Sequence, residues 1–435
     1  MYDIKIVDGL LYLNGKWSAE NLYLRDGKIA LISCEQFDSK EIYNAKGAYI
    51  IPGLIDSHVH LASLGSTSPA DDFYSGSIAA AIGGVTTIID FLAEAHLSQQ
   101  VEQLFNMRMK DAKDSIIDYS FHCSLCQPED IANIAKVSLS LGIPSLKLYT
   151  TYRGEGIYTD DKHLYEVLKR TSEKDIMVLC HTENDNLLYP EINQINRYSD
   201  RRPEICEISE AVKLAEMTSY SGGLTYMVHV SCGSTVSELK KRFSDIINKS
   251  FILESCPHYF IYDDTVYNKK SAHLYTMTPP LRSLHEREIL KRNIDLIHTI
   301  STDHCPFYSI QKNTDINNIP MGVGGLGYSF QQMYRLFGDS IINHFTINQA
   351  KTHGMYPQKG IIAEGSDADI TIFEHIEPAV TKDIRGNSDY SIYQGIDENI
   401  RILSVLSRGD FVIKDGSVLA EKGRGRFIRR NLSKI

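Results

Sequence analysis

The chain of 435 residues has no long apolar segment and no excess of basic charge. No apolar run approaches the ~18–20 residues that cross a bilayer, and the N-terminal Met-Tyr-Asp-Ile-Lys-Ile-Val lacks the pattern of a secretion signal. We therefore expect a soluble, cytoplasmic protein without a membrane partner. Lys and Arg number 45 against 55 Asp and Glu, so the net charge of −10 provides no global basic field that would attract nucleic acid.

The eight cysteines are scattered along the chain and do not outline a disulfide framework. Cys123 and Cys126 form one CxxC pair, but no second pair stands at the spacing of a zinc ribbon. We interpret the cysteines as reduced core residues. Hydrophobic residues make up 43% of the chain and charged residues 23%, a globular balance that argues against long disordered segments and against a fibrous protein.

Apolar, strand-like runs alternate with helix-like stretches through most of the chain. The runs lie at 54–60, 85–90, 117–123, 143–149, 176–181, 224–230, 250–254 and 297–303, and the helix-like stretches include 71–82, 161–173, 204–218 and 284–294. Such alternation indicates a parallel sheet. Eight units are what a (β/α)8 TIM barrel requires.

Both ends of the chain are rich in strand signals. Asp8-Gly9, Asn14-Gly15 and Asp26-Gly27 are typical hairpin turns, and the apolar runs 368–373, 402–406 and 411–413 suit strands. We therefore predict an α/β fold with a TIM-barrel domain over residues 51–360. Residues 1–50 and 361–435 are expected to pair into a small, discontinuous β-sandwich domain.

The strongest local signal for a functional site is Asp56-Ser57-His58-Val59-His60, which follows the apolar run 49–55. Side chains two residues apart on a strand point to the same face, so His58 and His60 are expected to project together. Active sites of such barrels lie at the carboxyl ends of the strands. Two imidazoles on one face at this end are half of a metal site.

Four more polar residues occur at or near the carboxyl ends of other predicted strands: Lys147, His181, His229 and Asp303. In a barrel these ends converge on one mouth, so residues far apart in the sequence become neighbours. Each residue alone has a structural explanation. Together, four histidines and one aspartate are good ligands for zinc, and their joint placement predicts a metal centre.

Lys147 is the unusual member of this set. It lies within the apolar run Ser145-Leu146-Lys147-Leu148-Tyr149, where a bare ammonium is expensive to bury. An ammonium would also be repelled by two metal cations. A neutral amine can instead add carbon dioxide to give a carbamate, which is an anionic, carboxylate-like bridge. We therefore hypothesise that Lys147 is carbamylated to N6-carboxylysine, with carbon dioxide or bicarbonate as the source.

The motifs around these residues resemble those of the cyclic amidohydrolases, specifically the dihydropyrimidinase and hydantoinase group of the amidohydrolase superfamily. The resemblance runs in order over nearly the whole chain. Its carriers include Ile51-Pro52-Gly53-Leu54-Ile55-Asp56-Ser57-His58-Val59-His60, Ser145-Leu146-Lys147-Leu148-Tyr149, His181-Thr182-Glu183-Asn184, Glu254-Ser255-Cys256-Pro257-His258-Tyr259, Thr278-Pro279-Pro280-Leu281-Arg282, Thr302-Asp303-His304-Cys305-Pro306-Phe307 and Tyr356-Pro357-Gln358-Lys359-Gly360.

The resemblance implies a zinc-dependent enzyme that hydrolyses the ring amide of dihydropyrimidines or 5-substituted hydantoins to N-carbamoyl amino acids. The implied ligands of two Zn²⁺ ions are His58, His60 and Asp303 for the more buried ion, His181 and His229 for the other, and carbamylated Lys147 as the bridge. A hydroxide between the ions would attack the amide, with Asp303 as general base and then acid. Tyr152 would hold the oxyanion, and Thr278 and Met321 stand at positions that contact the substrate ring.

Three features leave the substrate open. The segment Leu61-Ala62-Ser63-Leu64-Gly65 carries no charge, unlike the matching segment of dihydroorotases and allantoinases. His258, however, stands where the group has glutamine and resembles dihydroorotases. Met321 stands at the position of the group's asparagine. The alternatives are an allantoinase- or dihydroorotase-like enzyme acting on another cyclic ureide or imide, or a non-catalytic scaffold relative, although such relatives typically lose metal ligands.

The resemblance also implies a homo-oligomer, a tetramer or a dimer, in which a C-terminal extension crosses to a neighbour. The basic segment Gly423–Arg430 could make that contact or could be a solvated end. The expected binding partner is otherwise a small cyclic amide.

Overall fold

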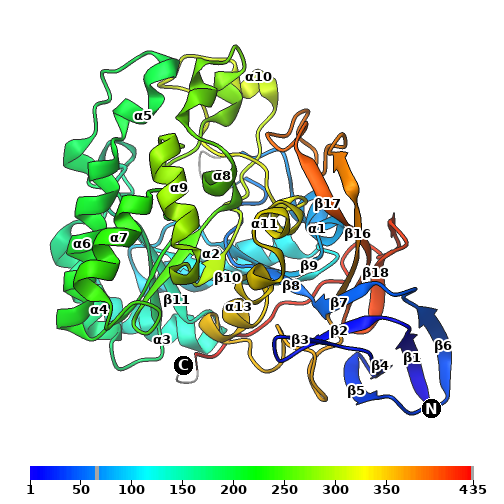
Figure 1. The fold of residues 1–435 in the computed structure, drawn as a ribbon. Helices are drawn as coiled ribbons and strands as arrows, with labels where there is room; N and C mark the ends of the chain where they lie inside the picture. The colour runs from blue at the N-terminus through cyan, green and yellow to red at the C-terminus, as the bar shows by residue number, and fades with distance from the viewer. Residues whose placement is uncertain (64–67, 433–435) are drawn as a thin grey trace.

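The barrel predicted for the centre of the chain is present. The computed structural model describes residues 1–63 and 68–432, and its eight-stranded parallel sheet has the order β15-β14-β13-β12-β11-β10-β9-β8 (Figure 1). The strands are β8 (Leu54–Asp56), β9 (Val85–Phe91), β10 (Asp118–Ser124), β11 (Ser145–Tyr149), β12 (Met177–His181), β13 (Leu224–Met227), β14 (Phe251–Ser255) and β15 (Thr299–Ile300). The barrel is nearly closed, because His60 donates its backbone N–H to the His304 carbonyl at 2.8 Å, beyond the ends of β8 and β15.

Three barrel strands stop before the carboxyl ends of the apolar runs predicted at 54–60, 224–230 and 297–303. β8 ends at Asp56, whose side chain accepts the backbone N–H groups of His58 and Thr302 at 3.1 and 3.2 Å. His229 and Asp303 adopt left-handed backbone conformations, with φ of 42° and 49°, which a strand cannot contain. His58 therefore follows β8 and does not lie on it, so strand alternation is the wrong reason for the convergence of the first two histidines.

Most barrel strands are predominantly apolar because both of their faces are covered. Every residue of β9 and β10 is buried. The main helices are α1 (Phe73–Ile82), α2 (Ser98–Ala112), α3 (Ile131–Leu141), α4 (Asp161–Thr171), α6 (Glu204–Ser221), α7 (Gly233–Phe243), α9 (Leu284–Arg292) and α11 (Ser329–Phe337). Shorter helices are α5 (Tyr198–Arg201), α8 (Pro257–Ile261), α10 (Ser309–Lys312), α12 (Ile342–Phe345) and α13 (Ile347–Thr352). Among the described residues, no helix is both long enough and apolar enough to cross a bilayer.

Local sequence explains where several of these helices begin and end. Asp72 precedes α1 and accepts the Ser75 backbone N–H at 2.8 Å, while Asp160 precedes α4 and accepts the His163 N–H at 2.9 Å. Gly142 ends α3 in a left-handed conformation that a side chain would disfavour.

Two further sheets contain the strands of the two chain ends: the four-stranded sheet has only N-terminal strands, and the seven-stranded sheet combines strands from both ends. The four-stranded sheet has the order β5-β4-β1-β6, and the seven-stranded sheet has the order β19-β18-β17-β16-β7-β2-β3. The strands are β1 (Tyr2–Val7), β2 (Leu10–Leu13), β3 (Lys16–Ser18), β4 (Asn21–Arg25), β5 (Lys28–Ser33), β6 (Ser39–Asn44), β7 (Tyr49–Pro52), β16 (Ile370–Val380), β17 (Asp397–Ser407), β18 (Asp410–Lys414) and β19 (Ser417–Val418). Asp8, Asn14 and Asp26 take the positive φ values, 56°, 50° and 53°, that their predicted turns require.

A buried ionic cluster joins the barrel to the seven-stranded sheet. The Lys359 nitrogen lies 2.8 Å from Asp118, at the start of β10, and 2.5 Å from Asp369, just before β16. Asp367 lies 3.2 Å from the same nitrogen, and Arg408 Nε lies 3.0 Å from Asp118. The spacing of the three carboxylates would suit a metal ion. Because the Lys359 ammonium is already their counter-ion, we interpret the cluster as a structural contact.

The basic C-terminal segment packs against its own barrel, so it is not a solvated end; its contact with a neighbouring subunit stays a prediction. It runs back beneath the barrel (the red trace leading to C in Figure 1). There the Tyr119 N–H donates to the Arg426 carbonyl at 2.9 Å, and the Ile428 N–H donates to the Tyr119 carbonyl at 2.7 Å. The segment docks because its backbone finds hydrogen-bond partners at the start of β10. This docking buries Arg430, which is 3% exposed.

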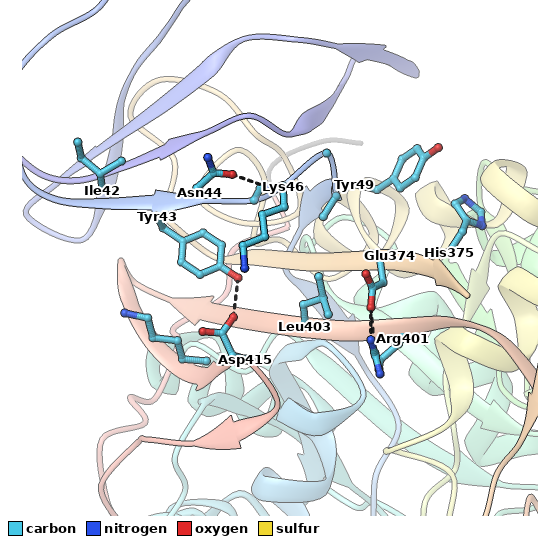
Figure 2. Close-up of a pocket in the computed structure, with 14 residues that line it drawn as sticks. Ile42, Tyr43, Asn44, Lys46, Tyr49, Glu374, His375, Arg401, Leu403 and Asp415 are labelled. Carbon is cyan, nitrogen blue, oxygen red and sulfur yellow. Dashed lines mark hydrogen bonds and ion pairs between the residues drawn. The ribbon is translucent and has the colours of Figure 1, made fainter. Parts of the chain in front are cut away.

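A surface hollow of about 660 Å³ lies between the β6–β7 connection and strands β16 to β18 (Figure 2). Its charged groups largely compensate one another: Arg401 Nε lies 3.0 Å from Glu374 Oε1, and the Tyr43 hydroxyl donates to Asp415 at 3.2 Å. None of the site residues predicted from the sequence lines this hollow.

Candidate metal centre

His58, His60 and Asp303 meet at one mouth of the barrel. Asp303 Oδ1 lies 3.2 Å from His58 Nε2 and 3.1 Å from His60 Nε2. Burial opposes ionisation of Asp303, but the imidazoles of His58 and His60 hold the pKa of its carboxyl well below the usual range. One atom from each of the three residues can be chosen so that all lie within 4.8 Å of one another, a spacing that suits a shared divalent ion.

His181 and His229 lie beside this group. Their ring centroids are 4.4 Å apart, and the His229 centroid lies 5.6 Å from that of His58. Burial lowers the pKa of His181 to about 4 and that of His229 well below its usual value. Both imidazoles are therefore neutral at pH 7, which is the metal-binding form. The combined donor set, imidazole nitrogens and a carboxylate, fits a divalent metal such as zinc.

Lys147 lies in β11 and is 1% exposed. Its nitrogen lies over the rings of Phe91 and Tyr149, 5.6 and 5.1 Å from their centroids. Within the described part of the chain, no carboxylate lies within 4 Å of this nitrogen. Burial lowers the pKa of the Lys147 ammonium to about 8. Carbamate formation requires a neutral amine, and the lowered pKa makes the neutral form of Lys147 more accessible near pH 7.

Two buried glutamates that were not predicted as site residues orient the histidines. Glu254 Oε1 lies 2.8 Å from His58 Nδ1, and Glu183 Oε2 lies 2.7 Å from His181 Nε2. Each carboxylate accepts one ring N–H and leaves the other ring nitrogen, Nε2 of His58 and Nδ1 of His181, to bind a metal. Glu254 did have a sequence signal, because it is a charged residue that closes the apolar run 250–254.

Arg202 is the counter-ion of Glu183. Its Nε lies 3.1 and 3.2 Å from the two Glu183 oxygens, and its Nη2 lies 2.8 Å from one of them. Burial would raise the pKa of Glu183, but the Arg202 guanidinium and the bond from His181 hold it well below the usual range. Arg202 also donates to Thr151 Oγ1 at 3.2 Å and lies 5.4 Å from the centroid of the Tyr152 ring. No sequence pattern marks Arg202, because the segment around it is irregular.

Tyr152 lies next to the histidines, with its ring centroid 5.1 Å from that of His181. Burial raises the pKa of the Tyr152 hydroxyl well above its usual value, so the group stays protonated and can donate a hydrogen bond. Thr278 and Met321 are joined to each other through Tyr198, another residue that was not predicted. The Tyr198 hydroxyl lies 3.3 Å from Thr278 Oγ1 and 3.1 Å from Met321 Sδ.

His258 lies in α8, directly after β14, and is 1% exposed. Neither of its ring nitrogens has a hydrogen-bond partner among the described residues, and burial lowers its pKa to about 4. The uncharged segment expected to shape the opposite part of the mouth is described only as far as Ser63; Leu64 and Gly65 lie outside the described residues.

Comparison with known proteins agrees with this geometry. Residues 49–412 match the family model described as "Amidohydrolase family". The chain is 31% identical over 448 residues to a D-hydantoinase of Geobacillus stearothermophilus, and the alignment covers 94% of this chain and 93% of the relative. Its fold is similar to that of D-hydantoinase from a Bacillus sp. AR9, with a TM-score of 0.92, 28% identity and 99% of both chains covered. It is also similar to dihydropyrimidinase from Brevibacillus agri NCHU1002, with a TM-score of 0.91, 27% identity and 99% of both chains covered.

Proposed function

Since the chain belongs to the amidohydrolase family and to its hydantoinase and dihydropyrimidinase group, we propose that it hydrolyses the ring amide of dihydropyrimidines or 5-substituted hydantoins to N-carbamoyl amino acids. The observation that carries this proposal is the convergence of four histidines, His58, His60, His181 and His229, with Asp303 at one mouth of the barrel. This mouth is where barrel enzymes have their active sites.

In the proposed centre, one zinc ion is held by His58, His60 and Asp303, and a second by His181 and His229. When bound, the two ions lower the pKa of a shared water and polarise the ring carbonyl. The buried carboxylates of Glu183 and Glu254 support this assignment, because each fixes the ring orientation of one histidine.

Lys147 would bridge the two ions as a carbamate. The ammonium first loses one proton; the neutral amine then attacks carbon dioxide, a nitrogen–carbon bond forms as one carbon–oxygen π bond breaks, and a second proton is released. Overall, the loss of two protons and the addition of carbon dioxide replace a buried positive charge by a negative one. The burial of Lys147 without a carboxylate in direct contact supports the assignment, because Asp303 and Glu254 offset the burial of an unmodified ammonium only in part.

Asp303 would move the proton of the reaction. Its carboxylate accepts a proton from the attacking water and delivers it to the ring nitrogen as the carbon–nitrogen bond breaks. The depressed pKa of Asp303 keeps its carboxylate ionised at pH 7, the form that a proton acceptor needs. Tyr152, whose hydroxyl stays protonated, would donate a hydrogen bond to the oxygen that gains charge at the carbonyl.

Thr278 and Met321 would contact the substrate ring, and Tyr198 would hold them in place. A related reaction on another cyclic ureide or imide is the second candidate. It is favoured by His258, whose two ring nitrogens have no hydrogen-bond partner in the described part of the chain and would serve an additional polar substituent. The thioether of Met321 also cannot donate a hydrogen bond to a ring carbonyl.

A ring-opening assay tests the proposal. Zinc-loaded protein in bicarbonate buffer would be given dihydrouracil, hydantoin and a 5-aryl hydantoin, and the ureido product would be measured. We expect product from at least one ring and none from the Lys147→Ala variant. Native mass spectrometry of the wild-type protein should show the added mass of one carbon dioxide.

The outcomes separate the candidates. Two bound metals without product from any of these rings would move the substrate to another cyclic ureide or imide. Neither metal nor product would favour a non-catalytic scaffold. A protein that binds both metals at its unmodified mass would contradict the carbamate.

The domain division and the assembly are part of the proposal. Residues 51–360 would form the hydrolase domain, and residues 1–50 and 361–435 the second domain, supported by the seven-stranded sheet, which combines strands from both ends. We also propose a cytoplasmic homo-oligomer, a tetramer or a dimer, which light scattering on the purified protein would test.

A further inference from the structure

The end of the barrel away from the candidate metal centre contains a buried cationic group. Arg430 reaches this place from the C-terminal segment and is 3% exposed, while His122 and His353 are fully buried. The Ser145 hydroxyl lies 2.7 Å from both Arg430 Nη2 and His122 Nδ1. The ring centroids of His122 and His353 are 5.6 Å apart. The side chains therefore form one cluster.

Two members of this cluster have unused hydrogen-bonding capacity. Arg430 donates through Nε to Ser120 Oγ at 2.9 Å and through Nη2 to Ser145 and the Phe121 carbonyl, but its Nη1 has no partner among the described residues. Neither ring nitrogen of His353 has a described partner. Buried donors are rarely left unpaired, and leaving one unpaired costs about 1–3 kcal/mol or more for a charged group.

The charge of Arg430 is also uncompensated. Two other arginines are equally buried, Arg108 and Arg282, and each has a carboxylate nearby: Asp90 at 2.6 Å and Glu207 at 3.6 Å. No described carboxylate lies within 4 Å of the Arg430 guanidinium. Burial lowers the pKa of Arg430 only to about 9, so the group is charged at pH 7, while the pKa of His353 falls well below its usual value and leaves a neutral ring with one N–H.

We propose that Arg430 Nη1 and the His353 ring bind a small monovalent inorganic anion of the chloride class at this end of the barrel. Such an anion accepts the unused N–H groups and also neutralises the guanidinium, whereas a water molecule would satisfy the hydrogen bonds and leave the charge buried. A divalent anion is disfavoured, because the cluster contains one formal positive charge and neutral imidazoles. The site is independent of the proposed hydrolase activity.

The direct test is a crystal of the full chain grown in sodium bromide. We expect an anomalous peak in hydrogen-bonding contact with Arg430 Nη1 and the His353 ring. In solution, the thermal midpoint of the wild-type protein should rise saturably as chloride replaces gluconate at constant ionic strength. Arg430→Met should abolish this rise, and His353→Ala should weaken the chloride affinity about tenfold, the loss expected for one hydrogen bond.

Arg429→Met is the matched control, because Arg429 is the exposed neighbour of Arg430 and should keep the wild-type response. Wild-type bromide crystals that show only water at Arg430 Nη1 would overturn the proposal. An equal chloride response in wild-type protein and Arg430→Met would overturn it as well. If Arg430→Met does not fold, the bromide crystal and His353→Ala decide the question.

Discussion

The substitution Arg202→Gln removes the main counter-ion of the buried Glu183 carboxylate. Arg202 reaches both oxygens of Glu183 at 2.8–3.2 Å, whereas the next guanidinium, that of Arg282, lies 3.9 Å away. Breaking a buried ion pair typically costs about 3–5 kcal/mol. We expect the lower end, about 3 kcal/mol, because the Arg202 side chain is 14% exposed and Arg282 remains nearby.

The same change should weaken metal binding at His181. Without Arg202, the Glu183 carboxylate is destabilised and holds the Nε2–H of His181 less firmly, so the Nδ1 lone pair is no longer fixed. Loss of such an outer contact typically lowers metal affinity about 10–100-fold. Competition with a chromogenic chelator would measure the affinity of the weaker metal, and urea unfolding of metal-free protein would measure stability.

Arg201→Gln is the matched control for this prediction. Arg201 is the preceding residue, but its guanidinium donates to the Ile192 carbonyl at 3.0 Å and to Asn317 at 2.9 Å, not to Glu183. Arg202→Lys should lie between the wild type and Arg202→Gln, because lysine keeps the charge and loses the two-pronged geometry. Wild-type metal affinity and wild-type stability in Arg202→Gln would refute the reasoning.

Three further predictions concern the buried Lys312, the ionic cluster around Lys359 and the metal centre. Burial lowers the pKa of Lys312 from 10.5 to about 7, so the folded state binds fewer protons there than the unfolded chain. From pH 7 to 10.5, the unfolding free energy of the wild type should therefore rise by up to ~5 kcal/mol relative to that of Lys312→Met. Parallel pH profiles of the two proteins would contradict this. Asp118→Asn removes an acceptor from Lys359 and Arg408 and should cost about 3–5 kcal/mol in urea unfolding, whereas a loss below about 1 kcal/mol would show that the cluster is not a structural contact. Chelation should abolish ring opening reversibly with little change in far-ultraviolet circular dichroism, because the barrel hydrogen bonds are made by the backbone and not by the ligand side chains; unfolding on chelation would contradict this.

The barrel could be predicted because its strands are buried on both faces, so most of them are predominantly apolar runs in the sequence. The position of each strand end was less predictable. β13 and β15 stop before His229 and Asp303, whose left-handed backbone depends on contacts made by the assembled mouth. Residues that follow strands could still be assigned to one mouth, because a shift of one or two residues does not move them to the other end of a barrel.

The ligands were therefore easier to predict than the groups that orient them. His181 follows directly from a strand end, whereas Arg202 and Tyr198 come from the irregular segment 185–202, whose path no local pattern specifies. Glu183 stands in the same motif as His181, but its role depends on the distant Arg202. Changes in the segment 185–202 would thus alter metal affinity and the part of the mouth that this segment forms. The pattern of metal ligands in the sequence would stay the same.

The C-terminal segment shows why charge in a sequence is a poor guide to exposure. Its arginines suggested a solvated end as one interpretation, but its backbone pairs with Tyr119, some 300 residues earlier, and this pairing buries Arg430. Packing of the whole chain determines such burial, so nothing local in the sequence could predict it. A buried guanidinium must then be compensated within the fold or by a bound ion. Since Arg108 and Arg282 have carboxylates and Arg430 has none within 4 Å in the described chain, the bound ion is the consistent solution.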